Sequence, residues 1–293
     1  MRMVVKTGPA LHNPGMRHTG GMKPLISADD LRARLEGGEQ VTVLDVRYRM
    51  GGPCGPGAYA EGHVPSAAYV DLDADLAAPP GGTQGGRHPL PDPARFAAAM
   101  RRCAVSAHRP VVVYDDWQGL AAGRCWWLLR HHGHPDVRLL DGGWAAWVAA
   151  GGSIETQAPE PGPGDFHAGP GPGDEVVTAE ELGRVGVLID ARAPARYRGE
   201  EEPVDAVAGH VPGAVNVPTS LNLTEDGCFR DVEDLREVYA EVGAVPGADV
   251  AVYCGSGVTA VHDIIALELL GVRARLYPGS WSEWSARATS GSP

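Results

Sequence analysis

One stretch near the end of the chain decides the fold: residues 250–260 read Val-Ala-Val-Tyr-Cys-Gly-Ser-Gly-Val-Thr-Ala. The apolar run Val250–Tyr253 is typical of a buried strand in a parallel sheet. Residues 258–270 are largely apolar and are followed by Gly271, so they predict a buried helix. A strand that enters a helix through a glycine-spaced loop places Cys254 where the strand ends.

The loop between this strand and this helix predicts a reactive cysteine. Gly255 and Gly257 are expected at positive φ, which turns successive backbone N–H groups toward Cys254. The helix N-terminus adds its dipole, and both effects favour the thiolate over the thiol. A buried structural cysteine is the alternative, which the strand, loop and helix context disfavours. The N–H groups expected to converge are those of Gly255, Ser256, Gly257, Val258 and Thr259.

The hexapeptide Cys-Gly-Ser-Gly-Val-Thr at 254–259 resembles the active-site loop of the two-domain sulfurtransferases, the rhodanese and 3-mercaptopyruvate sulfurtransferase family. The resemblance extends over nearly the whole chain after about residue 23. It implies an α/β fold of two tandem rhodanese-like domains, each a mainly parallel sheet flanked by helices. It also implies that Cys254 takes the outer sulfur of a small-molecule donor, holds it as a persulfide and passes it to a thiol or cyanide.

Composition limits the class of protein. The 293 residues, 43% of them hydrophobic, suffice for two cores. A net charge of −12 and the lack of a basic run argue against a nucleic-acid partner. Five scattered cysteines without a Cys-x-x-Cys pair suit a reducing compartment, and no window reaches the roughly 18 apolar residues that span a membrane. We expect a cytoplasmic protein that uses neither a metal nor an organic cofactor.

An internal repeat divides the chain into two halves. Four short motifs recur in the same order, so that Asp45 corresponds to Asp190, His63 to His210, Tyr114 to Tyr253 and Trp144 to Trp281. A repeat this long indicates a duplicated domain and not a solenoid. The expected organisation is a disordered tail at 1–22 (or a true start at Met22), a non-catalytic rhodanese-like domain at 23–150, a Pro/Gly linker at 151–174 and a catalytic rhodanese-like domain at 175–290.

Within each half, short apolar strands alternate with helix patterns, which predicts parallel βαβ units. Strands are expected at about 41–46, 111–115 and 137–141, then at about 186–191, 249–254 and 273–277. Helices are expected at about 27–36, 93–101 and 119–131, then at about 178–184, 231–241 and 258–270.

The repeat also indicates which half performs chemistry. Asp115 stands where the second half has Cys254, and a carboxylate cannot carry a sulfane sulfur. Residues 116–119 lack the glycine spacing of the Cys254 loop. We therefore expect the first half to be catalytically silent and to close one wall of a site between the domains.

Anionic donors need a cation beside the cysteine. The resemblance assigns Arg196, in an Arg-aromatic-x-Gly segment, to substrate binding, and a guanidinium suits a carboxylate or sulfonate. A surface arginine paired with the neighbouring glutamates is the alternative. The family's second substrate arginine has no counterpart in this chain, so Arg192, Arg198 or a first-domain group such as Arg87 or His88 would have to replace it.

For 3-mercaptopyruvate enzymes the resemblance also implies a relay from the loop serine, here Ser256, to a first-domain histidine and aspartate. His63 matches the histidine's motif, but the same Gly-His-x-Pro recurs at His210, which leaves a shared structural turn as the alternative. The sequence does not name the acid of this relay. Asp190, at a strand end, is a further candidate because it could hydrogen-bond Arg196.

The neutral residues Gly255 and Ser256 match the mercaptopyruvate version of the loop, because the rhodanese version has cationic residues there. We expect 3-mercaptopyruvate as the donor, with thiosulfate as the alternative, and the resemblance implies a thioredoxin-like protein or a small thiol as acceptor. A cysteine-dependent phosphatase would need arginine where Ala260 stands. A non-catalytic binding module would not need an intact Cys254 loop.

Overall fold

The computed structural model describes residues 23–49, 51–52, 54–160 and 162–290. The expected tail at 1–22 and the alternative start at Met22 lie outside the described residues.

The first half is one sheet of parallel strands in the order β1-β5-β4-β2-β3. Its strands are β1 (Leu25–Ile26), β2 (Thr42–Asp45), β3 (Ala68–Tyr69), β4 (Val111–Tyr114) and β5 (Val137–Leu140). Its helices are α1 (Ala28–Glu36), α2 (Gly55–Glu61), α3 (Leu72–Asp75), α4 (Pro93–Arg102), α5 (Ala122–His131) and α6 (Gly143–Ala149).

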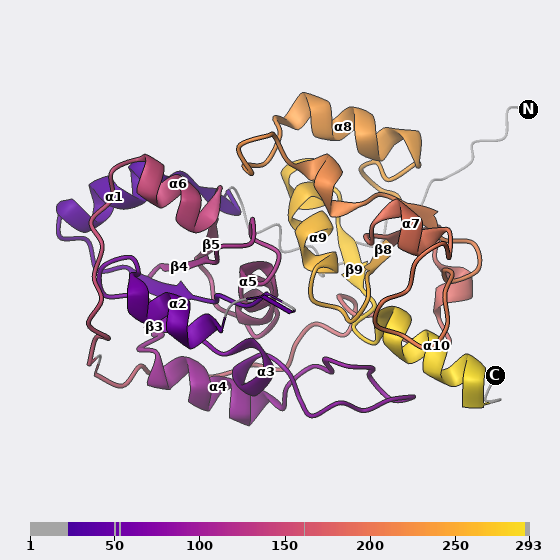
Figure 1. The fold of residues 1–293 in the computed structure, drawn as a ribbon, viewed down its shortest axis with the longest axis horizontal. Helices are drawn as coiled ribbons and strands as arrows, with labels where there is room; N and C mark the ends of the chain where they lie inside the picture. The colour runs from indigo at the N-terminus through magenta and orange to yellow at the C-terminus, as the bar shows by residue number, and fades with distance from the viewer. Residues whose placement is uncertain (1–22, 50, 53, 161, 291–293) are drawn as a thin grey trace, which may run out of the picture.

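The second half repeats this plan with a parallel sheet in the order β7-β6-β8-β9. Its strands are β6 (Val187–Asp190), β7 (Val215–Asn216), β8 (Val250–Tyr253) and β9 (Ala274–Leu276). Its helices are α7 (Pro194–Tyr197), α8 (Val232–Glu241), α9 (Ala260–Leu269) and α10 (Ser280–Ser290), with short 3₁₀ turns η1 (Leu182–Arg184) and η2 (Thr219–Asn222). Figure 1 shows the two halves side by side, the first in purple and the second in orange and yellow.

The predicted central strands and most of the predicted helices are confirmed. The helix expected at about 178–184 is wrong, because only the turn η1 forms there. Its hydrogen bonds, such as Arg184 N–H to the Glu181 carbonyl (2.9 Å), span three residues, and Gly183 at its centre disfavours a continued α-helix. The two-residue strands β1, β3 and β7 were not predicted, because they are too short to show a hydrophobic period.

The duplication is visible in matching polar contacts. The hydroxyl of Tyr114, at the end of β4, accepts a hydrogen bond from Val64 N–H (3.1 Å), and the hydroxyl of Tyr253, at the end of β8, accepts one from Val211 N–H (3.0 Å). The Gly-His-x-Pro turn is thereby fixed to the central strand in both halves. No helix among the described residues is long and apolar enough to cross a lipid bilayer.

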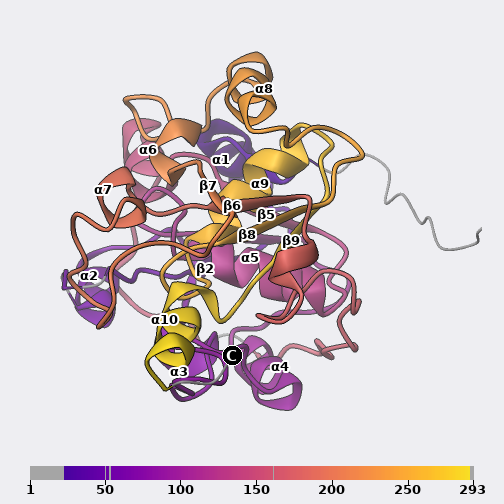
Figure 2. The same cartoon turned by 90° about the vertical axis from the view of Figure 1, so that its right-hand side faces the viewer.

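The halves meet along α5 and α9, where Val261 and Ile265 lie against Gly123. One apolar core cluster continues from the first sheet into the second. The loop after α3 also crosses to the second half and runs beneath α10 (Figure 1), where Arg87 N–H bonds Ser282 Oγ (3.1 Å). Figure 2 shows α3 and α10 on the same side of the molecule. This crossing brings first-half side chains to the end of β8.

Candidate active site

Cys254 follows β8 directly and is 1% exposed. Its backbone is fixed on both sides, because its N–H donates to Ser280 Oγ (3.1 Å) and its carbonyl accepts from Trp281 N–H (3.0 Å). The strand and these two bonds hold the thiol at the start of α9. The placement is the one expected from the sequence.

The two glycines of the Cys254 loop differ in backbone conformation and in their surroundings. Gly257 has φ +74°, and a Cβ there would lie 2.3 Å from the carbonyl oxygen of Pro278, so only glycine fits. Gly255 is not among the residues with positive φ, so that expectation is wrong. Glycine leaves room here for two side chains, because a Cβ would lie 3.1 Å from the Arg87 guanidinium and 3.4 Å from that of Arg196.

The corresponding loop of the first half surrounds an acidic side chain with backbone N–H groups. Asp115, in the place of Cys254, is completely buried and accepts four backbone hydrogen bonds of 2.8 Å each. The donors are the N–H groups of Trp117, Gly119, Ala121 and Ala122. The loop thus converges its N–H groups on an anion without the glycine spacing of the Cys254 loop. Gln118 and Gly119 adopt φ +60° and +83° and supply the turn.

Burial raises the pKa of the Asp115 carboxyl group. Protonation would nevertheless set an O–H against one of the four N–H donors, so the carboxylate is the form that fits the loop. In the second half, none of the N–H groups of residues 255–259 donates to another described residue. They are free to stabilise a negative charge on Cys254, as their counterparts stabilise Asp115.

Arg124 on α5 is a buried cation that the sequence interpretation missed. Its guanidinium donates to the Gly257 carbonyl (2.9 Å), and its other hydrogen bonds go to the carbonyls of Leu76, His88 and Pro89. Burial lowers the pKa of Arg124 to about 10, and the nearby Cys254 raises it. It therefore remains charged at neutral pH and favours an anionic sulfur. An arginine amid the apolar residues of α5 was the available signal.

A serine, histidine and aspartate lie in a chain across the domain boundary. Ser256 Oγ is 2.7 Å from His88 Nδ1, and His88 Nε2 is 3.2 Å from Asp73 Oδ1. Nε2 then donates to Asp73 while Nδ1 accepts from the serine hydroxyl. Burial lowers the pKa of His88, which favours this neutral form. The sequence had suggested His88 only as a substitute for the missing arginine.

His63 does not occupy this position. It is completely buried, its ring stacks on Tyr59 (4.0 Å between centroids), and its Nδ1 contacts the Tyr59 carbonyl (2.9 Å). His210 does the same with Tyr197, at 4.0 Å and 2.8 Å. Of the two alternatives left open from the sequence, the shared structural turn is the arrangement found in both halves.

Asp190 also belongs to the repeated framework. It is completely buried and pairs with Arg192 (2.8 Å), as Asp45 pairs with Arg47 (2.9 Å) in the first half. The suggested bond from Asp190 to Arg196 does not form. Arg192 itself stacks over Trp281, 4.8 Å from the ring centroid. This pair stabilises the end of β6.

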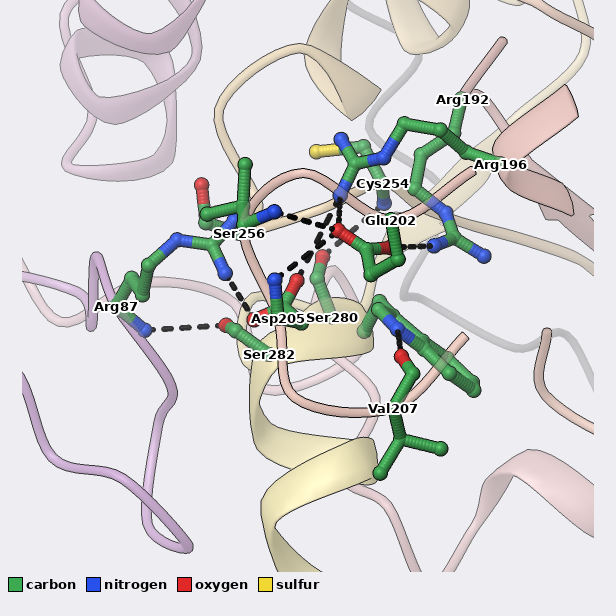
Figure 3. Close-up of polar contacts among 12 residues, drawn as sticks. Arg87, Arg192, Arg196, Glu202, Asp205, Val207, Cys254, Ser256, Ser280 and Ser282 are labelled. Carbon is green, nitrogen blue, oxygen red and sulfur yellow. Dashed lines mark hydrogen bonds and ion pairs between the residues drawn. The ribbon is translucent and has the colours of Figure 1, made fainter. Parts of the chain in front are cut away.

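Arg196 lies beside the Cys254 loop, as expected, and its side chain is 18% exposed. It pairs with Glu202 (2.6 Å) and lies 3.6 Å from Asp205. Arg87 approaches from the first half and pairs with Asp205. Figure 3 shows Glu202 and Asp205 lying between Arg87 and Arg196. Two guanidiniums thus flank the residue next to Cys254.

Fold and site together define a cysteine-dependent transferase built on a duplicated parallel α/β domain. No group of three or more His, Cys, Asp or Glu side chains in the described part of the chain is arranged to hold a metal ion. The family model described as "Rhodanese-like domain" matches residues 27–150 and again 175–287. The chain therefore belongs to the rhodanese-like sulfurtransferases.

Relatives support this assignment over nearly the full length. SseB of Mycobacterium tuberculosis, provisionally named a thiosulfate sulfurtransferase, is 46% identical over 90% of this chain and 95% of its own. A Pseudomonas aeruginosa protein, provisionally named a 3-mercaptopyruvate sulfurtransferase, is 44% identical over 89% of this chain and 94% of its own. The solved 3-mercaptopyruvate sulfurtransferase of Leishmania major aligns with TM-score 0.80 and 30% identity, over 94% of this chain and 76% of its own.

Proposed function

We propose that this enzyme takes the sulfur of 3-mercaptopyruvate onto Cys254 and passes it to a thiol. The contact of Ser256 with His88 and of His88 with Asp73 carries this proposal. The C–S bond of a mercaptoketone breaks with charge developing on a carbonyl oxygen, and a hydroxyl group beside the nucleophile can stabilise that charge. Thiosulfate has neither a carbonyl group nor a proton to relay.

The transfer takes place in two steps. The Cys254 thiolate attacks the donor's thiol sulfur, and the C–S bond breaks with its electron pair left on carbon as the enolate of pyruvate. The thiol proton passes through Ser256 to His88 and returns to the methylene carbon, so pyruvate leaves and Cys254 holds a persulfide anion. An acceptor thiolate then attacks the outer sulfur and restores the Cys254 thiolate.

The site's charges assist each step. The free N–H groups of the loop and the Arg124 guanidinium favour the thiolate and the persulfide. Arg196 and Arg87 both border Gly255, so they can bind the donor's carboxylate while the donor's thiol sulfur faces Cys254. For the acceptor we propose a thioredoxin-like dithiol protein or a small thiol, and a Thermus thermophilus relative at 33% identity is named a sulfur carrier protein.

Thiosulfate is the second candidate donor. Two arginines at the loop would suit a dianion, and the SseB relative carries the thiosulfate name. Steady-state kcat/KM for both donors, with cyanide and with a dithiol as acceptors, separates the two. A preference for thiosulfate would overturn the choice of 3-mercaptopyruvate.

The variants Ser256→Ala and His88→Gln test the relay. We expect either to lower kcat/KM for 3-mercaptopyruvate by about 10- to 100-fold, because proton transfer and carbonyl stabilisation are lost. Thiosulfate turnover should change by less than about 3-fold, because that donor needs no proton relay. Ser220→Ala, on the surface turn η2, serves as the control. Equal losses with both donors would show that Ser256 and His88 merely support the loop.

The pH dependence tests the protonation state of His88. Because burial lowers its pKa from an ordinary value of 6.5, His88 stays neutral as the pH falls through that value. We therefore expect the ratio of kcat/KM for 3-mercaptopyruvate to kcat/KM for thiosulfate to hold between about pH 8 and 6.5 and to fall only below it. A ratio that already falls near pH 7 would contradict the neutral relay.

A further inference from the structure

Two buried carboxylates of the second half contact the arginines of the donor site, which we define as Cys254, Arg87 and Arg196. The side chains of Glu202 and Asp205, on the loop after α7, are only 4% and 8% exposed. Acidic side chains at the surface of the same loop behave differently: Glu200 is 55% exposed and pairs with Arg198. The loop therefore directs two specific negative charges inward.

The two carboxylates have different roles in the structure. Glu202 is held by several partners: Arg192 (3.2 Å), Arg196 (2.6 Å) and the N–H of Asp205 (3.0 Å). Asp205 pairs through Oδ1 with Arg87, and its buried Oδ2 makes no hydrogen bond among the described residues and lies 3.6 Å from the Arg196 guanidinium. Glu202 is part of the framework, whereas Asp205 can leave Arg87 at the loss of one close ion pair and keep its longer contact with Arg196.

Both arginines of the donor site retain unused hydrogen-bonding capacity. The Nε atoms of Arg87 and Arg196 are buried and make no hydrogen bond within the described part of the chain. Both guanidiniums border the same residue, Gly255. A buried donor without a partner is costly, so these N–H groups favour an incoming anion.

The charges around the site balance. Three guanidiniums, those of Arg87, Arg192 and Arg196, face three carboxylates, those of Asp190, Glu202 and Asp205. Arg124 and an anionic Cys254 form a further balanced pair. A singly charged donor that displaces Asp205 from Arg87 leaves the net charge of the contacting groups unchanged. A dianion in the same place adds one excess negative charge to a partly desolvated site.

We propose that Asp205 determines donor specificity, by occupying Arg87 when no donor is bound and by disfavouring dianions such as thiosulfate relative to donors with a single carboxylate. The donor's carboxylate replaces that of Asp205 on Arg87, and Arg196 remains with Glu202. This inference rests on the proposed function, because it assigns the donor class of the same site. It also explains how a site with two arginines can prefer a singly charged donor, as the neutral residues Gly255 and Ser256 indicate.

The variant Asp205→Asn keeps the shape of the side chain and removes its charge. We expect kcat/KM to rise by about 10-fold for thiosulfate and by about 3-fold or less for 3-mercaptopyruvate, because the dianion gains more from a site that is one charge more positive. Glu200→Gln, on the exposed part of the same loop, should change neither. An unchanged ratio between the two donors, or a fall with both, would overturn the proposal.

A binding measurement separates this inference from the proposed function. Calorimetric titration of the enzyme with pyruvate and with sulfate measures a single carboxylate and a dianion without turnover. Asp205→Asn should increase the affinity for sulfate by about 10-fold and that for pyruvate by about 3-fold. Arg87→Gln should decrease both affinities by about 10-fold. If neither sulfur donor is turned over but these shifts appear, the proposed function fails and the role of Asp205 stands. Unchanged sulfate binding in a folded Asp205→Asn enzyme would refute that role.

Discussion

Replacing Cys254 with serine is expected to lower kcat/KM for every sulfur donor by at least about 10⁴-fold, because a hydroxyl group cannot accept and release a sulfane sulfur. The fold should survive, because serine differs by one atom and the backbone of residue 254 is held by Ser280 and Trp281. Steady-state transfer to cyanide and a thermal melt on the same preparation measure the two effects. Mass spectrometry after donor treatment should place the added sulfur on Cys254.

Cys54→Ser provides the matched control, since Cys54 is exposed and lies in the first half. Its activity and melting temperature should equal those of the unmodified enzyme. Transfer retained by Cys254→Ser, or an added sulfur found on another cysteine, would disprove the assignment of Cys254 as the sulfur carrier.

Replacing Asp115 with alanine is expected to lower the free energy of unfolding by roughly 3–5 kcal/mol, because four buried N–H groups lose their acceptor together. The loss should appear as a lower midpoint in a urea titration followed by tryptophan fluorescence. Asp115→Asn should also destabilise, because its NH₂ group would face two of the N–H donors. Both variants test whether the Asp115 carboxylate stabilises the conformation of this loop.

Asp116→Ala is the control for Asp115→Ala. Asp116 is the next residue, and its carboxylate makes only a partly exposed pair with Arg49 (3.6 Å). Such a pair contributes less than about 1 kcal/mol. Similar losses from the two alanine variants would show that the four hydrogen bonds of Asp115 do not stabilise the loop as argued.

Local sequence determined the duplicated framework and the position of Cys254. Strand, glycine and helix signals lie within a few residues of Cys254, so they can be interpreted without knowledge of tertiary contacts. The alternation of strand and helix patterns predicted the parallel sheets, and the repeat predicted a catalytically silent first half. The position of Arg196 beside the loop was also expected, because the family resemblance rests on a local motif that lies on the short helix α7.

Contacts between distant segments were decided only by the tertiary structure. His88 and Ser256 are 168 residues apart, and Arg124 and Gly257 are 133 apart, so no periodicity or spacing relates them. They meet because α5 packs on α9 and the loop after α3 crosses to α10. The pairing of Asp205 with Arg87 has the same origin. The sequence by itself determined the position of Cys254 at the end of its strand, whereas the packing of the two halves decided which charged and proton-carrying groups surround it.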